Sequence, residues 1–469
     1  MRLVMKFGGT SLGDGERIRR AAELVKSYLD ENEVIVVCSA MNGVTDTLFM
    51  LVEKASRGRE RDVGKILGEL EEKHVEAVRA AVRSGSERSK AEEMIRRDLE
   101  ELRRAVLGVL YLREATPRSK DYIVSYGERL STRIFWASLT DMGVEAEYLD
   151  GGSAGIITDS NFGEATPLIE ITRLETKRRV GSLIDRGIIP VITGYIGVNE
   201  EGVVTTLGRG GSDYTATILG YCLKADEIWL WSDVDGLMTA DPRIVKDARV
   251  LPSISYGEAI EMALFGAKGL HPRALEPAME AGIPVRIRNT FNPSAPGTLI
   301  TSNPEKLGLI VKAVLLVRDV AMLTIRGASM VGKPGTAAKI LSTLAQKDIN
   351  ILMISQSVSE SGLTIIIPRR MLSRALGALE SALLGSRLVR EIKTEDDVSV
   401  VAVVGEGMKG TPGVASRVFG AVASRGINIR MIAQGSSELN ISFAVQEDDA
   451  PEAVKAIHEE YQLDKLGPK

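Results

Sequence analysis

The sequence predicts an α/β protein with a mostly parallel open sheet, followed by a smaller region of two α+β modules. From residue 1 to about residue 292, short β-branched apolar runs alternate with stretches of helical periodicity. At the N-terminus, a strand, a glycine turn, a helix and a buried strand follow one another, which is typical of a βαβ unit. In the last third of the chain, one stretch repeats another without a gap, which indicates a duplicated module.

The first βαβ unit is predicted over residues 3–40. The run "LVMKF" is followed by Gly8 and Gly9, and then by a helix over residues 14–30. One face of that helix is apolar, made by Ile18, Ala21, Ala22, Val25 and Leu29. Residues 33–40, "EVIVVCSA", read as a strand buried on both faces, so we expect a parallel sheet covered by helices.

Three further apolar runs, at 121–128, 187–197 and 226–236, are expected to be buried strands. Each ends in polar or glycine residues, and open α/β sheets bind ligands at the carboxyl ends of their strands. Between the first βαβ unit and the run at 121–128, residues 57–120 are rich in Arg, Glu and Lys at helical spacing. This predicts a solvated helical elaboration.

The chain is expected to divide into 1–292, a linker with a strand at 293–317, and two modules at 318–392 and 393–469. The boundary lies in "NPSAPGTLITSNPEK", which is rich in proline. Met330–Glu360 then aligns with Met408–Glu438 at a constant offset of 78 residues. Each copy has a glycine turn, a helix and two strands, as in a βαββαβ module. A solenoid would need three or more repeats.

Composition excludes several classes of function. The 59 Lys and Arg are balanced by 63 Asp and Glu, and aromatic residues make up 4%, so nucleic acid is not an expected partner. No apolar stretch has the length of a signal peptide core or a membrane span, so we expect a cytoplasmic protein without a membrane partner. The two cysteines lie in apolar contexts and the three histidines are scattered, so neither a disulfide framework nor a bound metal site is expected.

Two glycine turns carry candidate anion sites. In "MKFGGTS", Lys6 and the backbone N–H groups of Gly8 and Gly9 precede a helix, although the spacing is not that of a Walker A loop. A turn that holds no ligand is the alternative for this stretch. In "LGRGGSD", Arg209 offers a planar fork for a carboxylate or phosphate, and Asp213 fits an N-cap as well as a catalytic group.

A third polar stretch, "SDVDGLMTADPR", follows the strand "EIWLW". Its acidic residues lack the terminal glutamate of an EF-hand, so a Ca²⁺ loop is not indicated. A loop at the end of a strand suits contacts with a nucleotide, and a plain polar turn remains the alternative.

Six motifs, in order, resemble those of the aspartate kinase family: "KFGGTS", "SAMNGVTDTL", "VSYGERLS", "TTLGRGGSDYTA", "WSDVDGLMTADPR" and "FGAKGLHPRA". The repeated modules resemble the tandem ACT domains of that family, so the resemblance covers essentially the whole chain. It implies a three-layer αβα amino-acid-kinase fold followed by two ferredoxin-like ACT domains.

The resemblance implies transfer of the ATP γ-phosphoryl group, with Mg²⁺, to the β-carboxylate of L-aspartate, giving 4-phospho-L-aspartate for lysine, threonine and methionine biosynthesis. Lys6 and Asp213 are implied as catalytic, Arg209 as the clamp for the substrate α-carboxylate, and Glu128 as the partner of its α-ammonium. Further substrate contacts are implied for Ser39, Thr45, Tyr195 and Ser212. ATP contacts are implied for Lys6, Phe7, Gly8, Gly9, Ser232, Asp233, Met238, Arg243 and Lys268. Tyr195, Ser232 and Met238 depart from residues common in the family (Phe, Thr and Tyr), and we interpret His271 as structural.

The ACT modules imply an amino-acid effector and a homodimer or dimer of dimers formed through them. Candidate effector contacts are Met330, Gly335, Asn350, Ile351, Gln356, Asn428, Ile429 and Gln434. Glutamine and serine suit a hydroxyl group, which favours threonine, while Glu360 keeps lysine open because a buried ammonium needs a charged partner. A kinase for another amino acid such as glutamate and a silent amino-acid sensor are the alternatives. The sensor predicts loss of Lys6, Arg209 or Asp213, and all three are present.

Overall fold

The protein is described by a computed structural model covering residues 1–267, 270–305, 307–327, 334–356, 362–383 and 389–466. The chain forms two compact units. The first contains Met1–Leu237, Pro252–Tyr256 and Lys268–Glu305, and the second contains Met238–Leu251, Gly257–Ala267 and Lys306–Lys469.

The first unit is built on an eight-stranded sheet with the order β3-β5-β2-β1-β8-β10-β11-β9. All neighbouring strands are parallel except β10 and β11, so the prediction of a mostly parallel sheet is confirmed. Its strands are β1 (Arg2–Phe7), β2 (Glu33–Cys38), β3 (Ala146–Leu149), β5 (Ile189–Thr193), β8 (Glu227–Ser232), β9 (Ser253–Ser255), β10 (Val285–Asn289) and β11 (Thr298–Thr301).

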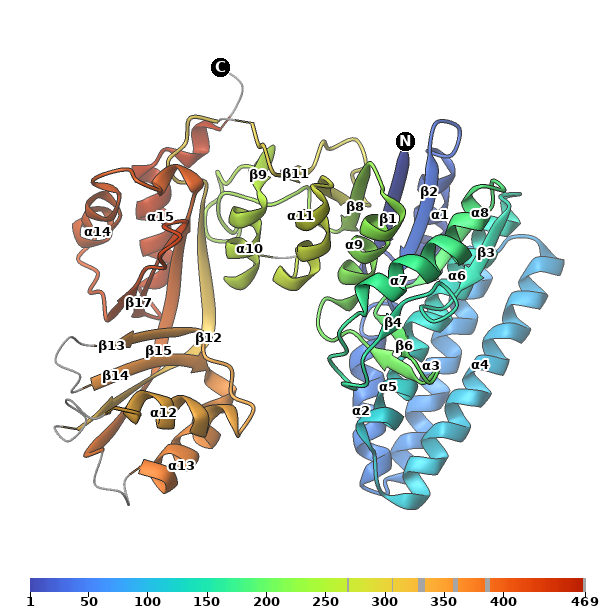
Figure 1. Ribbon diagram of the computed structural model, residues 1–469, viewed down its shortest axis with the longest axis horizontal. Coiled ribbons are helices and arrows are strands. Elements are labelled where there is room, and N and C mark those ends of the chain that lie inside the picture. The colour runs from blue at the N-terminus through green and yellow to red at the C-terminus, as the bar shows by residue number, and fades with distance from the viewer. Residues whose placement is uncertain (268–269, 306, 328–333, 357–361, 384–388, 467–469) are drawn as a thin grey trace. The chain divides into compact units, whose positions relative to one another are not determined.

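Helices cover both faces of this sheet (Figure 1). Because side chains alternate along a strand, Leu3, Met5 and Phe7 of β1 enter one apolar cluster with the helices on that face. That face is covered by α1 (Gly15–Lys26), α2 (Val44–Ser56), α3 (Glu60–Ala81), α4 (Gly85–Leu112) and α6 (Tyr126–Asp141). Lys6 therefore points to the opposite face, where α9 (Gly211–Leu223) packs on β1 and β8.

Two smaller groups of elements complete this unit. A three-stranded sheet contains β4 (Ile157–Thr158), β6 (Ile196–Asn199) and β7 (Val204–Thr206). The remaining helices are α5 (Pro117–Val124), α7 (Ile169–Thr176), α8 (Ser182–Ile184), α10 (Tyr256–Leu264) and α11 (Glu276–Ala281). From Gly257 onward, α10 belongs to the second unit.

The strand predicted at 121–128 is wrong, because these residues form the end of α5 and the start of α6. Thr116 caps α5 by accepting a hydrogen bond from the Ser119 N–H group, and Pro117 occupies its first position. These start signals precede the apolar run that resembled a strand. The helical elaboration predicted at 57–120 is confirmed, although α3 and α4 bury one face and are solvated only on the other.

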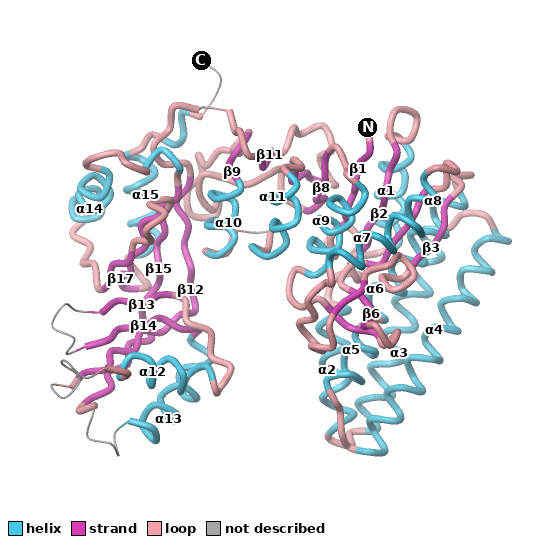
Figure 2. The backbone as a smooth tube through the Cα atoms, in the orientation of Figure 1, coloured by secondary structure: helices cyan, strands magenta, loops and turns pink. Residues whose placement is uncertain are grey.

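The second unit is built on a six-stranded sheet with the order β13-β14-β12-β15-β17-β16. Figure 2 shows its strands between the helix pairs α12, α13 and α14, α15. The strands are β12 (Ala313–Arg326), β13 (Met353–Gln356), β14 (Gly362–Pro368), β15 (Glu391–Val404), β16 (Met431–Ala433) and β17 (Asn440–Gln446). The helices are α12 (Thr336–Ala345), α13 (Leu372–Leu383), α14 (Val414–Ser424) and α15 (Ala450–Glu460).

The two modules exchange strands through β12 and β15. Residues 320–326 of β12 pair with β14 of the first module, whereas 313–317 pair only with 400–404 of β15. Residues 398–404 of β15 in turn pair with β17 of the second module. The strand before the first module therefore completes the sheet of the second.

The compact units differ from the boundaries expected from the sequence. β11 lies inside 293–317 and pairs with β10 in the large sheet, so this stretch is not simply a linker. Residues 238–251 and 257–267 belong to the second unit, where Ala240 enters an apolar cluster with α14 and α15. A buried ion pair between Lys312 Nζ and Glu258 Oε2, at 2.7 Å, holds α10 in that unit.

Both cysteines, Cys38 and Cys222, are buried free thiols, and burial raises the pKa of each. Within the described ranges, no helix combines the length and apolar character needed to cross a membrane.

Candidate active site

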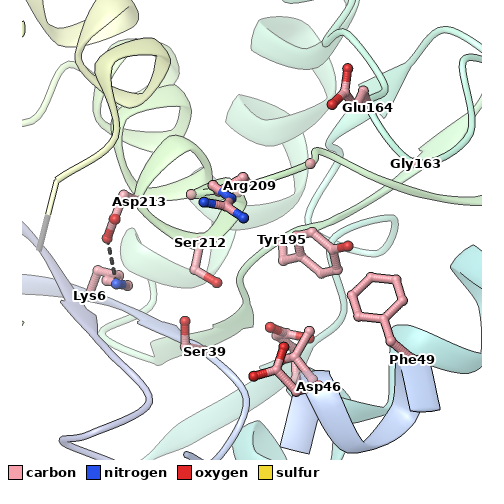
Figure 3. Close-up of a pocket in the computed structure, with 15 residues that line it drawn as sticks. Lys6, Ser39, Asp46, Phe49, Gly163, Glu164, Tyr195, Arg209, Ser212 and Asp213 are labelled. Carbon is pink, nitrogen blue, oxygen red and sulfur yellow. Dashed lines mark ion pairs between the residues drawn. The ribbon is translucent and has the colours of Figure 1, made fainter. Parts of the chain in front are cut away.

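A cavity of about 510 Å³ opens in the first unit at the carboxyl ends of β1, β2 and β5 (Figure 3). It contains all eight residues that the sequence suggested for catalysis and substrate binding: Lys6, Ser39, Thr45, Glu128, Tyr195, Arg209, Ser212 and Asp213. These residues come from five separate stretches of the chain, so the fold brings them together. The cavity is also lined by Asp46, Phe49, Gly163, Glu164, Gly208, Gly210 and Gly211.

Lys6 and Asp213 form an ion pair at one side of the cavity (Figure 3). Lys6 Nζ lies 2.5 Å from Asp213 Oδ1, and the two side chains are only 11% and 12% exposed. The N-cap of α9 is Gly210, not Asp213, and Asp213 lies in the first turn of the helix. The N-cap interpretation is therefore wrong, and the Asp213 carboxylate is directed at Lys6 instead.

The glycine loop before α9 needs glycine for two reasons. Gly210 has a φ of +72°, and a Cβ atom there would lie 2.4 Å from the Cβ of His271. A Cβ atom on Gly211 would lie 2.6 Å from a ring carbon of Tyr195. The His271 side chain thus packs against the loop, and burial lowers its pKa.

Glu128 is a buried carboxyl group that has one oxygen atom unused. Gly127 allows α6 to approach the loop after β2, because a Cβ atom there would lie 2.9 Å from that of Ala40. The Ala40 N–H group donates to Glu128 Oε1 at 3.2 Å, while Oε2 has no hydrogen-bond partner in the described part of the chain. Burial raises the pKa of Glu128 to about 8. A cation that entered this site would find an unused acceptor.

Arg209, Ser212 and Tyr195 lie between the ion pair and the wall formed by Asp46 and Phe49 (Figure 3). Tyr195 has a φ of +67°, which is strained for a residue with a side chain. Its N–H group donates to Thr215 Oγ1 at 3.0 Å, which holds this conformation against α9. Such strain is concentrated at functional sites.

The predicted phosphate turn has only part of the expected geometry. The Gly8 N–H group already donates to the Trp231 carbonyl oxygen at 3.1 Å, so the prediction that this amide binds an anion is wrong. The β1–β8 pairing simply continues to Gly8. A Cβ atom on Gly9 would lie 3.1 Å from the Ala40 carbonyl oxygen, so glycine keeps the turn narrow there. The Phe7 side chain packs on Phe135 and Trp231 in the core.

The other residues suggested for ATP divide between the two units. Ser232 ends β8 next to β1 and donates to Asp233 at 3.2 Å. Met238 and Arg243 belong to the second unit, where Arg243 Nη2 lies 2.6 Å from Asp241 Oδ2. Lys268 lies outside the described residues.

The effector candidates occupy matching places in the two modules. Asn350, Gln356, Asn428 and Gln434 are exposed, and they flank the edge strands β13 and β16. The buried Met353 and Met431 of these strands share one apolar cluster, so the two edges lie close together. Gly335 is the N-cap of α12, and Ile351 and Ile429 are partly buried. Met330 and Glu360 lie outside the described residues.

Several cavity residues were missed by the sequence analysis. Phe49 follows Thr45 by one turn of α2, so helical spacing could have identified it. Asp46 lies beside Thr45 in a motif that had been singled out. Gly163 and Glu164 follow β4 in a loop that carries no recognisable signal, and only the tertiary structure brings them to the cavity.

Comparisons with known proteins agree with this architecture. Residues 1–289 match the amino acid kinase family, and residues 323–383 and 401–461 match the ACT domain. Aspartokinase 1, chloroplastic, of Arabidopsis thaliana is 36% identical over 465 residues, which are 98% of this chain and 80% of that protein. E. coli aspartokinase III in complex with aspartate and ADP is 31% identical with a TM-score of 0.82, covering 98% of this chain and 99% of that one. The same values hold for its complex with lysine and aspartate. The chain therefore belongs to the aspartokinases, amino acid kinases that carry two ACT domains.

Proposed function

We propose that the cavity binds L-aspartate and that the protein transfers the γ-phosphoryl group of ATP to its β-carboxylate, giving 4-phospho-L-aspartate and ADP. The observation that carries this proposal is the charge arrangement. Among the residues that the structure describes, the buried Glu128 Oε2 has no donor, and Arg209 lines the same cavity. Opposite charges of the protein then face the α-ammonium and α-carboxylate groups of one amino acid. The complex of E. coli aspartokinase III with aspartate and ADP supports this choice of substrates.

Lys6 and Asp213 act on the reacting groups. In the reaction, a β-carboxylate oxygen attacks the γ-phosphorus while the bond to the bridging oxygen breaks, and no proton has to be removed from the nucleophile. Catalysis therefore depends on positioning and on cations near the phosphoryl oxygens. Lys6 supplies one such cation, and Asp213 orients it through their 2.5 Å ion pair.

The residues present fit a nucleotide with Mg²⁺. Glycines 8 and 9 leave no side chain between the turn and a phosphate group, and the Asp213 carboxylate is a ligand type that Mg²⁺ prefers. When bound, Mg²⁺ neutralises charge on the phosphates. Ser232, Asp233, Met238, Arg243 and Lys268 are proposed to complete the nucleotide site, and Ser39, Thr45, Tyr195 and Ser212 the aspartate site.

We further infer that the paired ACT modules bind an amino-acid effector, threonine in preference to lysine, and join subunits into a homodimer or a dimer of dimers. The exposed Gln356 and Gln434 suit a hydroxyl group better than a second ammonium. The lysine complex of E. coli aspartokinase III supports lysine as the alternative. In this proposal the catalytic domain is 1–292, 293–317 joins it to the regulatory region, and 318–392 and 393–469 are the ACT modules.

The enzymatic proposal is tested by trapping the acyl phosphate. With ATP, Mg²⁺ and hydroxylamine, the purified protein should form aspartyl hydroxamate at a rate far above that with glutamate. A reaction without amino acid is the control. The absence of hydroxamate above that control, or equal rates with glutamate, would refute aspartate as the substrate.

A further inference from the structure

A buried carboxylate that no step above uses connects three segments around the cavity. Asp121, in α5, is only 3% exposed and accepts three hydrogen bonds. Its Oδ2 atom accepts from the N–H groups of Gly163, at 2.9 Å, and of Thr206, at 2.8 Å. Its Oδ1 atom accepts from the Thr206 hydroxyl group at 2.9 Å.

The three connected segments carry the groups that face the substrate. Asp121 lies seven residues before Glu128, across the junction of α5 and α6. Thr206 ends β7 and is followed within three residues by Arg209. Gly163 itself lines the cavity, and the neighbouring Ala165 N–H group donates to the Thr206 carbonyl oxygen at 2.9 Å.

Packing alone does not explain a carboxylate at this place. Burial disfavours the charged form and raises the pKa of Asp121, whereas the hydrogen bonds from Gly163 and Thr206 lower it. An apolar side chain of similar size would avoid the cost of burying the charge but would leave the buried Thr206 N–H group and the Gly163 N–H group without this acceptor. The carboxylate is the group that can accept from the Gly163 loop and from the end of β7 at once.

We propose that Asp121 is a positioning residue that holds Glu128 and Arg209 at a fixed spacing, and so sets where the β-carboxylate of the substrate lies relative to Lys6. The proposal rests on the function proposed above. Glu128 and Arg209, which are proposed to bind the substrate's ammonium and carboxylate groups, belong to segments distant in sequence. Asp121 joins these two segments directly. A looser spacing misplaces the nucleophile and weakens the preference for aspartate over the longer glutamate.

The test uses as its control a second carboxylate that accepts hydrogen bonds and has a side chain only 3% exposed. Asp141, at the other end of α6, accepts from the Arg83 and Ser84 N–H groups at 3.0 and 2.8 Å and from the Arg19 guanidinium at 2.9 Å. It lies about 20 Å from Glu128 along the helix, at a rise of 1.5 Å per residue. Asp121→Ala and Asp141→Ala therefore each remove three accepted hydrogen bonds, but only the first acts on the cavity.

Asp121→Ala should raise the KM for aspartate roughly 10- to 100-fold and leave the KM for ATP unchanged, because small displacements of reacting groups are costly. The ratio of kcat/KM for aspartate to that for glutamate should fall as well. Asp141→Ala should change neither quantity, although both variants unfold at lower temperature. Asp121→Asn keeps an acceptor for both N–H groups and should restore most of the wild-type KM. An unchanged KM and substrate ratio in folded Asp121→Ala would overturn the proposal.

If Asp121→Ala does not fold, the KM values of the Thr206→Val variant test the proposal instead. This substitution removes the hydroxyl donor and keeps both backbone hydrogen bonds. A higher aspartate KM with an unchanged ATP KM supports the proposal, and unchanged values for both substrates contradict it.

Hydrogen exchange of the proteins without ligand tests the positioning role of Asp121 independently of whether aspartate is the substrate. Asp121→Ala should speed exchange at the amides of Gly163 and Thr206, whereas Asp141→Ala should speed it at Arg83 and Ser84. If the wild type forms no aspartyl hydroxamate but this exchange pattern appears, the assignment of aspartate as substrate is wrong. The positioning role of Asp121 is then still supported. If the wild type phosphorylates aspartate while Asp121→Ala has normal exchange, the positioning role of Asp121 is wrong. The assignment of aspartate as substrate is then still supported.

Discussion

At the scale of single residues, burial and charge decide the chemistry of this cavity. Glu128 keeps one oxygen without a partner in the described ranges, and Lys6 is held 2.5 Å from Asp213. The first arrangement favours uptake of a cation, and the second keeps the Lys6 ammonium oriented where little of it is exposed to water.

The pH dependence of aspartate binding should reflect Glu128. Its pKa of about 8 means that the carboxyl group is mostly protonated at neutral pH in the free protein. An α-ammonium group requires the charged form, so the KM for aspartate should fall as pH rises through 8. Glu128→Gln should have a high KM without this dependence. Steady-state assays between about pH 6 and pH 9 would check it, and a flat wild-type profile would contradict it.

Glu128 also makes the stability of the protein depend on pH. Binding of aspartate should improve as pH rises, whereas the free energy of unfolding should decrease. Its folded pKa lies above the ordinary 4.5, so between pH 4.5 and pH 8 the folded protein binds a proton that the unfolded chain releases. The free energy of unfolding contributed by Glu128 therefore decreases as pH rises through this window. Relative to Glu128→Gln, the wild type should lose stability over the same range in urea unfolding, if aspartate is absent.

Lys6 and Arg209 should differ in the kinetic parameter that they control. Lys6→Ala removes a cation beside the transferring group, so kcat should fall roughly 100- to 1000-fold. Arg209→Ala removes a contact made equally in the ground state, so it should chiefly raise the KM for aspartate. Steady-state kinetics with both substrates measure the two effects. Equal changes of kcat and KM in both variants would refute this division of roles.

At the scale of elements, close contacts between backbones fix how the helices meet the sheet. α1 approaches α3 so closely that a Cβ atom on Gly15 would lie 2.2 Å from the Ala77 carbonyl oxygen. α1 also follows the Gly8–Gly9 turn after residues 10–14 and packs on α6, whose first turn carries Glu128. The α1–α3 contact thus helps to set the position of the turn that follows β1.

Gly15→Ala should lower the stability of the protein by about 1–3 kcal/mol, because the added methyl group has to separate α1 from α3. Gly64→Ala is the matched control on α3, where an added Cβ atom meets nothing within 4 Å. It should raise stability by about 0.5–1 kcal/mol through helix propensity. Urea unfolding of the two variants measures both changes, and a neutral Gly15→Ala would contradict the contact.

At the scale of the whole molecule, the boundary between the units divides the stretch proposed for the nucleotide. Residues 238–251 follow directly after β8 and Asp233, yet they belong to the unit of the two modules. There the Thr239 N–H group donates to the Arg249 carbonyl oxygen, and the Val314 N–H group of β12 donates to the Thr239 carbonyl oxygen at 2.8 Å. Thr239, the neighbour of Met238 in sequence, is thus bonded to the first strand of the modules.

The effector should be identified by titrating the hydroxamate assay with threonine, lysine and methionine. Threonine is expected to inhibit, and inhibition by lysine alone would overturn this choice. Gln356→Ala and Gln434→Ala occupy equivalent places in the two modules, so each is the control for the other. The variant that loses inhibition while its uninhibited rate stays normal identifies the module that binds the effector.

Much of the fold was predictable because it depends on local patterns. The alternating residues of β1, the apolar face of α1 and the constant offset between the modules are all encoded over short distances. The prediction failed at 121–128, where an apolar run is equally consistent with a buried helix, and only the Thr116 cap and Pro117 could have distinguished the two. It also failed at Asp213, since the N-cap depends on the backbone of Gly210.

By itself, the sequence predicted most of the element order and the glycine turns, because residue type and spacing express these directly. The eight candidate residues for catalysis and substrate binding came from the resemblance of its motifs to one family. Only the tertiary structure decided that Glu128 Oε2 has no partner among the described residues, that the Gly8 amide is already used, and that Asp121 joins the Gly163 loop to the end of β7. Each of these is a matter of which polar groups meet across distant segments. Burial and hydrogen-bond satisfaction are properties of the packed chain, so no local pattern records them.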